Sequence, residues 1–333
     1  MPHLRRGWRS REPRTGDVDG LVALLSAAAR AVTGSSSVDR ESVVTEAVGL
    51  GSWTRRQVVV LDDEERARAW ARVHDRAAGR TVVSVTVDPG CHDEELAASL
   101  FRWAETTAAE VSRQRQLSVT QLDSEALSAD GRQRGWLTAA GYSQTRTWLQ
   151  MSRPVDRTEA EPGVLPGLRP GVTVRPVASH GNGLPVASDL QTVHQLLEES
   201  FADHFNSYRE SFPEFVQRLR EDPGHRWDHW WVATVDVDGT PLPAGAVVGS
   251  VLPADASGRQ GSYVDYIGVH RRARGRGVAK ALIYTVIADA ARRGHNRVGL
   301  EVDADSPTRA DALYTSLGWV TRYRTESWHK DLG

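Results

Sequence analysis

The stretch Tyr263–Ala291 reads YVDYIGVHRRARGRGVAKALIYTVIADAA and passes from a strand pattern, through a basic turn, into a helix pattern. β-Branched and aromatic residues are frequent in Tyr263–Val269, which predicts a strand. Apolar side chains recur every four residues from Val278 onward, which predicts a helix. Residues 270–277 carry four arginines and two glycines, so they cannot continue the strand. We therefore expect a strand–turn–helix unit here.

The start of this helix has the chemistry of an anion-binding site. The first N–H groups of a helix have no intrahelical partner and carry partial positive charge. Gly275 and Gly277 leave room for an anion, and Arg274 and Arg276 add full positive charge. A dinucleotide fingerprint is excluded because Lys280 stands where its third glycine is required, and the chain has no P-loop pattern. The spacing therefore predicts a pyrophosphate site.

This turn resembles the acyl-CoA signature of the GNAT acetyltransferase superfamily. The family pattern Q/R-x-x-G-x-G/A is matched by RGRGVA at residues 274–279, after a strand that ends in IGV at residues 267–269. Downstream, ALYTSLGW at residues 312–319 resembles the family's A-x-x-L-Y-x-x-x-G-F/W segment. The resemblance implies an α/β (α+β) fold in which a mixed, mostly antiparallel sheet with a splayed central strand pair is flanked by helices.

The resemblance also implies acetyl-CoA as the co-substrate and a set of residues that bind it. The pantetheine arm would pair with the backbone of Ile267 and Val269 like an added strand. The amide of Gly268 or Val269 would polarise the thioester oxygen. The expected cofactor-binding residues are Ile267, Gly268, Val269, Arg274, Gly275, Arg276, Gly277, Val278, Ala279, Lys280 and Ser306.

Two further residues are expected to carry the chemistry of acyl transfer to an amine. Such a transfer needs an acid for the departing thiolate and a base for the amine. Tyr314 stands at the family's tyrosine position, and its phenol is the expected acid. Asp265, on the strand that leads into the turn, is the expected base. The alternatives for the base are Glu301 and Asp303 at the end of the next strand. Asp203 and His204, at the end of the first helix of the second half, are the alternative that would line the acceptor side instead.

The first half of the chain resembles a degenerate repeat of the second half, which implies an internal duplication. Thr81–Val87 predicts a strand, residues 88–95 a turn and Leu96–Arg113 a helix. We expect a degenerate GNAT-like domain at residues 1–152, a Pro- and Gly-rich linker at 153–171 and a catalytic GNAT domain at 172–333. In the second domain the expected strands are Val172–Val177, Trp230–Val237, Ala246–Pro253, Tyr263–Val269, Asn296–Val302, Val320–Arg324 and Glu326–Lys330, and the expected further helices are Asp189–Phe205, Arg209–Arg220 and Thr308–Leu317.

The two turns differ in charge. Asp93, Glu94 and Glu95 stand at the helix start of the first half, where carboxylates cap the helix and complement its dipole. They also place negative charge where a pyrophosphate would bind. We therefore expect that the first domain has lost CoA binding in the usual mode.

The composition describes a globular protein of two domains without a strong net charge. The chain has 333 residues, of which 40% are hydrophobic, and a net charge of −2, so a nucleic-acid partner is disfavoured. Cys91 is the only cysteine, which suits a reducing cytoplasm. No signal-peptide pattern or long apolar run occurs, so we expect no membrane partner. Lys280 and Lys330 are the only lysines, an arginine bias typical of GC-rich bacterial genomes.

A metal site is not expected. His225 and His229 have the i, i+4 spacing that holds a metal on a helix. However, Pro223, Gly224 and three nearby tryptophans favour a loop that leads into a strand, and no cysteine joins the histidines.

Tandem chains with a degenerate first half resemble the mycothiol synthase-like group of this superfamily. VDAD at residues 302–305 is similar to that group, but residues 306–308 hold one residue more than its usual pattern. The expected function is an acetyl-CoA-dependent N-acetyltransferase that acts on a primary amine of a small molecule, as a monomer or homodimer. The alternatives are a non-catalytic acyl-CoA-binding regulatory protein and a mycothiol synthase-type enzyme.

Overall fold

The computed structural model describes residues 1–34, 38–76, 79–202, 210–306 and 309–332. They form two compact units, of which the first comprises Met1–Leu149, Asp303–Arg309 and Tyr323–Gly333. The second comprises Gln150–Val302 and Ala310–Arg322. Each unit therefore contains residues from both halves of the sequence.

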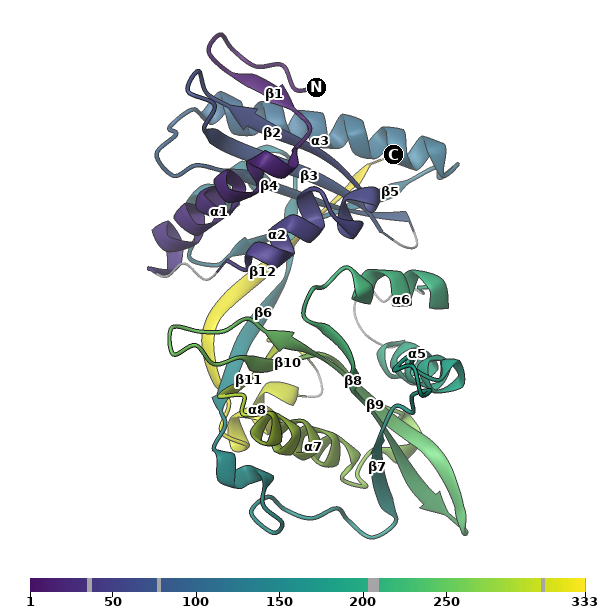
Figure 1. The fold of residues 1–333 in the computed structure, drawn as a ribbon. Coiled ribbons are helices and arrows are strands. Elements are labelled where there is room, and N and C mark those ends of the chain that lie inside the picture. Colours follow the sequence, from purple (N-terminus) through teal and green to yellow (C-terminus); the bar gives the residue numbers. More distant parts are fainter. Residues whose placement is uncertain (35–37, 77–78, 203–209, 307–308, 333) are drawn as a thin grey trace. The chain divides into compact units, whose positions relative to one another are not determined.

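The first half of the chain has the order strand, two helices, three strands, helix, strand, helix, strand (Figure 1). Its elements are β1 (Arg9–Arg11), α1 (Val18–Thr33), α2 (Arg40–Ala47), β2 (Arg55–Leu61), β3 (Ala67–Asp75), β4 (Arg80–Val87), α3 (Glu94–Gln114), β5 (Thr120–Leu127), α4 (Gly131–Ala139) and β6 (Ser143–Pro154). The sequence did not predict α2, whose start is capped by the Asp39 carboxylate, which accepts a hydrogen bond from the Ser42 N–H at 3.0 Å.

The second half repeats this order, which confirms the tandem arrangement. Its elements are β7 (Val172–Pro176), α5 (Ala187–Phe201), α6 (Phe212–Arg220), β8 (His225–Val237), β9 (Thr240–Leu252), β10 (Gly261–Val269), α7 (Val278–Arg293), β11 (Arg297–Asp303), α8 (Ala310–Ser316) and β12 (Val320–Leu332). The strand order is β1-β2-β3-β4-β5-β12 in the first unit and β6-β11-β10-β9-β8-β7 in the second.

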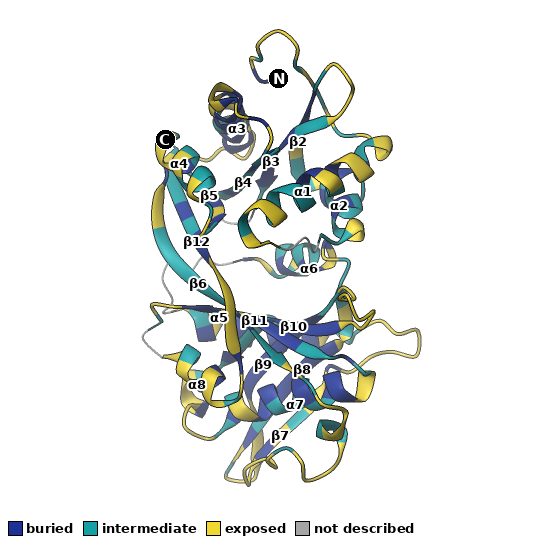
Figure 2. Ribbon diagram, turned by 90° about the vertical axis from the view of Figure 1, so that its left-hand side faces the viewer, coloured by how far each residue is buried: buried dark blue, intermediate teal, exposed yellow. Residues whose placement is uncertain are grey.

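The sheet of the second unit is covered by helices on both faces because side chains alternate along its strands. A Cβ on Gly245 would lie 2.9 Å from Val278 of α7, so this position of β9 faces that helix. The next residue, Ala246, belongs to the core cluster formed with α5 and α6. Most of β9 is buried for this reason (Figure 2). The first unit repeats the pattern, with α1 and α2 packed on one face of its sheet and α3 on the other.

The predicted splayed strand pair is present in the second unit. β10 and β11 run parallel, but they pair only between Ser262–Val264 and Val298–Leu300. β10 continues to Val269 and remains paired with β9 on its other side. The predicted mixed, mostly antiparallel sheet is therefore confirmed, and one side of β10 is left open beyond Val264.

The last strand differs from the expectation in two respects. The sequence predicted two short closing strands at Val320–Arg324 and Glu326–Lys330, but β12 is one continuous strand, because its pairing with β5 begins at Thr325 and continues to Leu332. This pairing also groups Tyr323–Gly333 with the first unit, whereas the sequence expectation placed these residues in the second domain.

Several element starts were also wrong, including that of β9, which begins at Thr240 and not at Ala246. β8 begins at His225 and not at Trp230, because His225 already pairs with Ser250 before a bulge interrupts the ladder. α6 begins at Phe212, where Ser211 and Glu214 form a capping box. The predicted start of this helix, Arg209, lies outside the described residues, as does part of the predicted end of α5.

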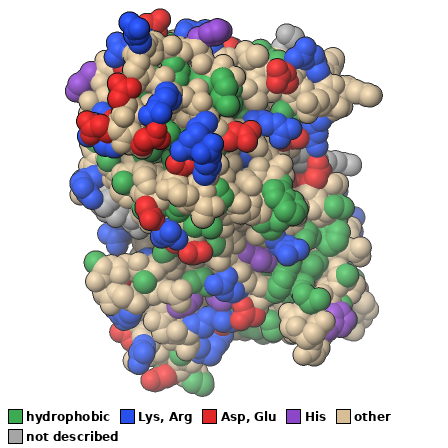
Figure 3. All heavy atoms as spheres, turned by 45° about the horizontal axis from the view of Figure 1, so that its top comes forward, with side chains coloured by type: hydrophobic (Ala, Val, Ile, Leu, Met, Phe, Trp, Pro, Cys, Tyr) green, Lys and Arg blue, Asp and Glu red, His purple; other side chains and the backbone are tan. Residues whose placement is uncertain are grey.

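On the face drawn in Figure 3, basic and acidic side chains are interspersed. Among the described residues, no helix combines the length and apolar character that a membrane span requires.

Candidate functional site

The basic turn between β10 and α7 leaves the start of α7 open. Gly275 and Gly277 have φ angles of 78° and 88°, a left-handed conformation that glycine adopts readily. Gly277 is the N-cap residue of α7, and no side chain caps this helix. The first N–H groups of α7 therefore have no side-chain acceptor in the described part of the chain, and they can donate to an external anion.

The charges around this turn are not neutralised by the described protein. Arg274, Arg276 and Lys280 are exposed, and none of them has a carboxylate of the described residues within ion-pair distance. The Arg276 guanidinium donates only to the backbone oxygen of Asp236, at 3.3 Å. Val278 is buried and anchors the helix, and Ala279 is partly buried beside it. The turn therefore combines free N–H groups with free positive charge.

The open side of β10 leads directly into this turn. Ile267, Gly268 and Val269 pair with β9 but have no partner on β11, so part of their backbone hydrogen-bonding capacity is unused by the sheet. A Cβ on Gly268 would lie 2.9 Å from Ser200 of α5, so only glycine fits there without a shift. The structure thus brings together all the predicted cofactor-binding residues from Ile267 to Lys280.

Asp265 is the extra residue of a β-bulge, which interrupts the pairing of β10 with β9 between Val264 and Tyr266. A bulge redirects side chains and is frequent next to active sites. The Ser250 hydroxyl donates to the Asp265 carboxylate at 3.2 Å. Burial, and next the negative charge of Asp222, raise the pKa of Asp265 to about 7. This carboxyl therefore changes protonation state near neutral pH.

Tyr314 lies on α8 with its ring against Trp319, at a centroid distance of 5.9 Å. The residue is 7% exposed, and burial raises the pKa of its phenol to about 12. The hydroxyl therefore keeps its proton throughout the neutral and mildly alkaline range. A buried phenol in this state is a hydrogen-bond and proton donor rather than a base.

The other carboxylates have protein partners. Gln150 of β6 donates a hydrogen bond to Glu301, and burial raises the pKa of Glu301 although solvent reaches the residue. The Asp303 carboxylate accepts from the Asp305 N–H at 2.8 Å. Asp303 and Ser306 belong to the first compact unit, so the structure does not join them to the turn of the second unit. Asp203 and His204 lie outside the described residues.

The corresponding turn of the first unit is filled by its own side chains. Asp93 caps α3 by accepting from the Leu96 N–H at 3.3 Å, and it also pairs with Arg5 at 2.8 Å. Arg132 donates to backbone oxygens of the turn, including that of Cys91. The helix start that is open in α7 is thus satisfied from within in α3.

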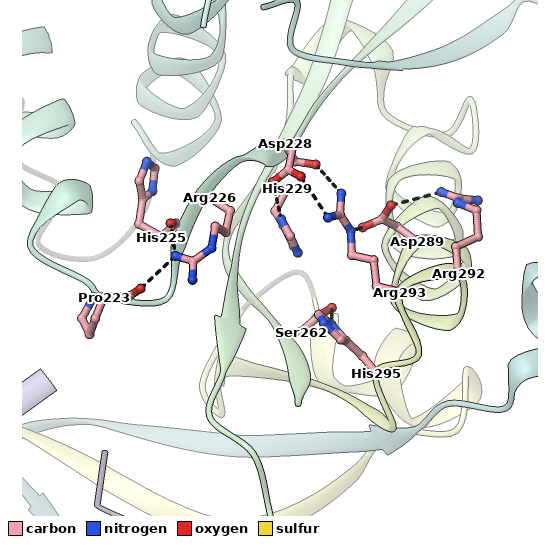
Figure 4. A network of polar contacts seen from close by, with 10 residues as sticks. All are labelled: Pro223, His225, Arg226, Asp228, His229, Ser262, Asp289, Arg292, Arg293 and His295. Atoms are coloured by element: carbon pink, nitrogen blue, oxygen red, sulfur yellow. Dashed lines mark hydrogen bonds and ion pairs between the residues drawn. The ribbon is translucent and has the colours of Figure 1, made fainter. Parts of the chain in front are cut away.

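The two histidines with helix-like spacing lie on β8 and do not share a site. The His225 ring packs against the Trp227 ring with a centroid distance of 4.3 Å. The His229 ring stacks on the His295 ring with a centroid distance of 6.1 Å, and its Nδ1 lies 2.9 Å from the Asp228 carboxylate, within hydrogen-bond distance. Figure 4 shows the two rings well apart, with Asp228 joined to Arg293 on the other side. Burial lowers the pKa of both His225 and His229. Among the described residues, no group of three or more histidine, cysteine or acidic side chains is arranged to hold a metal.

Two features of the site were missed at the sequence level. Ser250, the partner of Asp265, lies on β9 and is one of many serines, so nothing in its neighbourhood marks it. The bulge at Asp265 was missed because alternation of side chains along Tyr263–Val269 is assumed to be regular. The aspartate inside a run of apolar residues was the one available signal.

Comparison with known proteins agrees with this geometry. The sequence profile of the Acetyltransferase (GNAT) family matches residues 190–319. A GCN5-related N-acetyltransferase from Sphaerobacter thermophilus has a similar fold, with a TM-score of 0.76 and 23% identity over 99% of this chain and 97% of that one. No curated protein matches the chain in sequence.

Two further solved structures share the fold. A tandem GNAT protein from the clavulanic acid biosynthesis pathway superposes with a TM-score of 0.69 and 16% identity, over 98% of both chains. N-myristoyltransferase of Saccharomyces cerevisiae, solved with bound myristoyl-CoA, superposes with a TM-score of 0.61 and 10% identity, over 98% of this chain and 79% of that one. At these identities the likeness concerns the fold.

Proposed function

We propose that this chain, which belongs to the GNAT acetyltransferase superfamily, transfers an acetyl group from acetyl-CoA to a primary amine of a small molecule. The observation that carries the proposal is that the open side of β10 leads directly to the open start of α7. Beyond Val264, β10 stays paired with β9 but is no longer paired with β11. It leads into a helix whose first N–H groups have no side-chain cap among the described residues. This arrangement suits a ligand with an amide-bearing arm and a pyrophosphate.

Each part of acetyl-CoA has a proposed place in the second unit. The pyrophosphate binds the turn formed by Arg274–Lys280, and the pantetheine arm pairs with Ile267 and Val269. Ser306, the remaining expected cofactor contact, belongs to the first unit and stays a prediction from the sequence. A backbone N–H of Gly268 or Val269 stabilises the negative charge that develops on the thioester oxygen.

The chemistry is direct attack of the amine on the thioester in a ternary complex. Asp265, directly or through a water molecule, removes the proton of the ammonium form or of the attacking amine. The amine nitrogen bonds to the acetyl carbon, and the bond from that carbon to sulfur breaks. Tyr314 donates its proton to the departing thiolate. A small-molecule amine and a cytoplasmic location, the latter resting on the single Cys91, are part of the proposal.

The decisive experiment is an assay of the whole chain with acetyl-CoA and a panel of primary amines, in which a thiol reagent detects released CoA. Amine-dependent release, with the acetylated amine identified by mass spectrometry, supports the proposal. Slow release at the same rate with every amine, combined with tight binding of acetyl-CoA, would favour a non-catalytic acyl-CoA-binding protein. The 306–308 segment bears on a mycothiol synthase-type activity, but its positions 307 and 308 lie outside the described residues.

Asp265→Asn is expected to remove an inflection near pH 7 from the rate profile. The pKa of Asp265 is raised to about 7, so the carboxyl is protonated and inactive as a base below that pH and ionised above it. In the wild type kcat/KM should rise about tenfold per pH unit below the inflection, and the variant should lose about 100-fold at pH 8. The measurement is kcat/KM between pH 5.5 and 9.5.

Ser250→Ala provides a second measurement of the same role. The Ser250 hydroxyl favours the ionised form of Asp265, so its removal should raise the pKa of this carboxyl and move the inflection to higher pH. Ser262→Ala is the matched control, since the Ser262 hydroxyl contacts His295 instead, at 2.8 Å. An inflection that stays in place in Asp265→Asn would assign the base to another group.

Titration of the whole chain is expected to show one acetyl-CoA site. Gly277→Val should weaken binding at least about 10-fold, because a side chain at a φ of 88° is strained by about 1–2 kcal/mol and projects into the turn. Gly90→Ala, in the turn of the first unit, should change nothing. A second site that survives Gly277→Val would show that the first unit also binds CoA. The whole chain is used because the first unit includes Tyr323–Gly333.

A further inference from the structure

Arg169 reaches the basic turn from a part of the chain that the family profile does not cover. It lies in the segment that the sequence identifies as a linker, whereas the profile matches residues 190–319. Its guanidinium Nη1 donates to the backbone oxygen of Gly275 at 3.1 Å. Its side chain also lies against Gly277, since a Cβ placed on that glycine would be 2.8 Å from Cδ of Arg169.

The backbone around Arg169 is fixed to the sheet of the same unit. The oxygen of Arg169 accepts from the Val172 N–H at 3.0 Å, and the oxygen of Gly171 accepts from the Asp236 N–H at 2.7 Å. Gly171 has a φ of 76°, which makes this tight turn possible. Asp236 also receives the hydrogen bond from Arg276. The arginine is therefore held at the turn from a fixed backbone and does not belong to a free tail.

The guanidinium of Arg169 has donors to spare. It is exposed, and none of the described carboxylates lies within ion-pair distance of it. Among the described residues its hydrogen-bond partner is a neutral carbonyl, whereas a guanidinium carries five N–H donors. The guanidinium can bind a carbonyl oxygen and an oxyanion at the same time, because its N–H donors point in several directions.

We infer that Arg169 is a further acyl-CoA-binding residue, which positions the Gly275–Gly277 turn and donates to the pyrophosphate. The inference rests on the proposed function. By holding the Gly275 carbonyl, Arg169 fixes the peptide plane between Gly275 and Arg276, and with it the direction of the neighbouring N–H groups. Its charge adds to those of Arg274 and Arg276 on the approach to the helix start. The linker thus contributes to the cofactor site.

The test compares Arg169→Gln and Arg169→Lys with the wild type in the whole chain. Isothermal titration should show acetyl-CoA binding weakened about 10- to 30-fold by Gln, which lacks the charge-assisted hydrogen bond, and less by Lys, which keeps the charge but not the fork. Arg259→Gln, an equally exposed arginine before the opposite end of β10, should bind like the wild type.

A second substrate separates binding of the phosphates from support of the fold. S-acetylpantetheine carries the thioester and the amide-bearing arm but no phosphate, so kcat/KM with this donor should be unchanged in Arg169→Gln. An equal loss with both donors would show that Arg169 only supports the local structure and would overturn the inference. Equal binding of acetyl-CoA by Arg169→Gln and the wild type would overturn the inference alone. Failure of the wild type to bind acetyl-CoA would overturn the proposed function as well.

Discussion

Tyr314→Phe is expected to lower kcat about 100-fold and to leave the affinity for acetyl-CoA within about twofold of the wild type. The substitution removes only the hydroxyl, so the ring keeps its place against Trp319. In the proposed reaction the hydroxyl matters when the bond to sulfur breaks and negative charge develops there. The loss should therefore fall on turnover and not on binding. Steady-state kinetics with a reactive amine, together with titration of acetyl-CoA, measure the two effects separately.

The pKa of Tyr314 adds a constraint on the pH profile. Because burial raises the pKa of this phenol to about 12, it remains protonated over the whole range in which the protein can be assayed. Deprotonation of Tyr314 should therefore cause no fall in rate at alkaline pH. The alkaline sides of the rate profiles of the wild type and of Tyr314→Phe should have the same shape. A general acid with a pKa far above the working pH holds its proton but transfers it less readily, so its contribution depends on the basicity of the thiolate it faces.

Tyr142→Phe is the matched control for Tyr314→Phe. Tyr142 lies in the first unit, is also buried and has its pKa raised by burial, so the same atom is removed from a similar environment. This control should leave kcat unchanged. Full turnover in Tyr314→Phe would exclude the phenol as the acid, and an equal loss in Tyr142→Phe would point to a general effect on stability.

The sequence predicted the second unit well where local physics decides the structure. The strand at β10 and the helix α7 follow from side-chain periodicity, and the turn between them follows from glycines at positive φ. Arg274 and Gly277 were identified from their residue types at a predicted helix start and from the resemblance to the family signature, and in the structure they lie at an open helix start. These features depend on neighbours in the chain, so a single sequence contains the information.

The features that the sequence did not predict arise from distant parts of the chain. The bulge at Asp265 depends on how β10 fits against β9, and the role of Ser250 depends on that fit. Arg169 was predicted to lie in the interdomain linker because the segment around it is rich in Pro, Gly and charged residues, although its side chain donates a hydrogen bond to Gly275. The pairing of β12 with β5 joins residues that are far apart in the sequence, which local patterns do not reveal.

Removal of residues 323–333 is expected to unfold the first unit even though these residues are the end of the chain. β12 pairs with β5 from Thr325 to Leu332, so the truncated chain would lose the partner of a whole strand. Trp328, which is 6% exposed, belongs to the same core cluster as Phe101 and Leu122. The exposed edge of β5 would also promote aggregation.

Polar contacts of β12 reinforce this packing. Glu326, which is 5% exposed, receives a hydrogen bond from Arg134 at 3.0 Å. Lys330 pairs with Glu105 of α3 at 2.6 Å and donates to the backbone oxygen of Ala140 at 2.8 Å. Truncation would leave Arg134 and Glu105 without these partners, in addition to the lost core contacts. Because Glu326, Trp328 and Lys330 are two residues apart along β12, the apolar and the polar contacts come from the same face of the strand.

A point substitution in β12 tests the same packing with a smaller loss of stability than truncation. Trp328→Ala should lower the free energy of unfolding by about 3–5 kcal/mol, the usual cost of removing a large buried aromatic side chain. Trp53→Ala is the matched control, because Trp53 is 78% exposed and its loss should change stability by less than about 0.5 kcal/mol. Urea unfolding followed by circular dichroism measures both values.

Hydrogen exchange locates the loss within the chain. In the truncated protein, amide protection should disappear from β5 and α3, whereas β9 and α7 should keep theirs because their cores lie in the second unit. Retained protection in β5 after truncation would show that the first unit is complete without β12. If the prediction holds, removal of residues 323–333 will unfold the first unit, which lacks the proposed catalytic residues. Acetyl-CoA binding by the truncated protein then measures how far the second unit depends on a folded first unit.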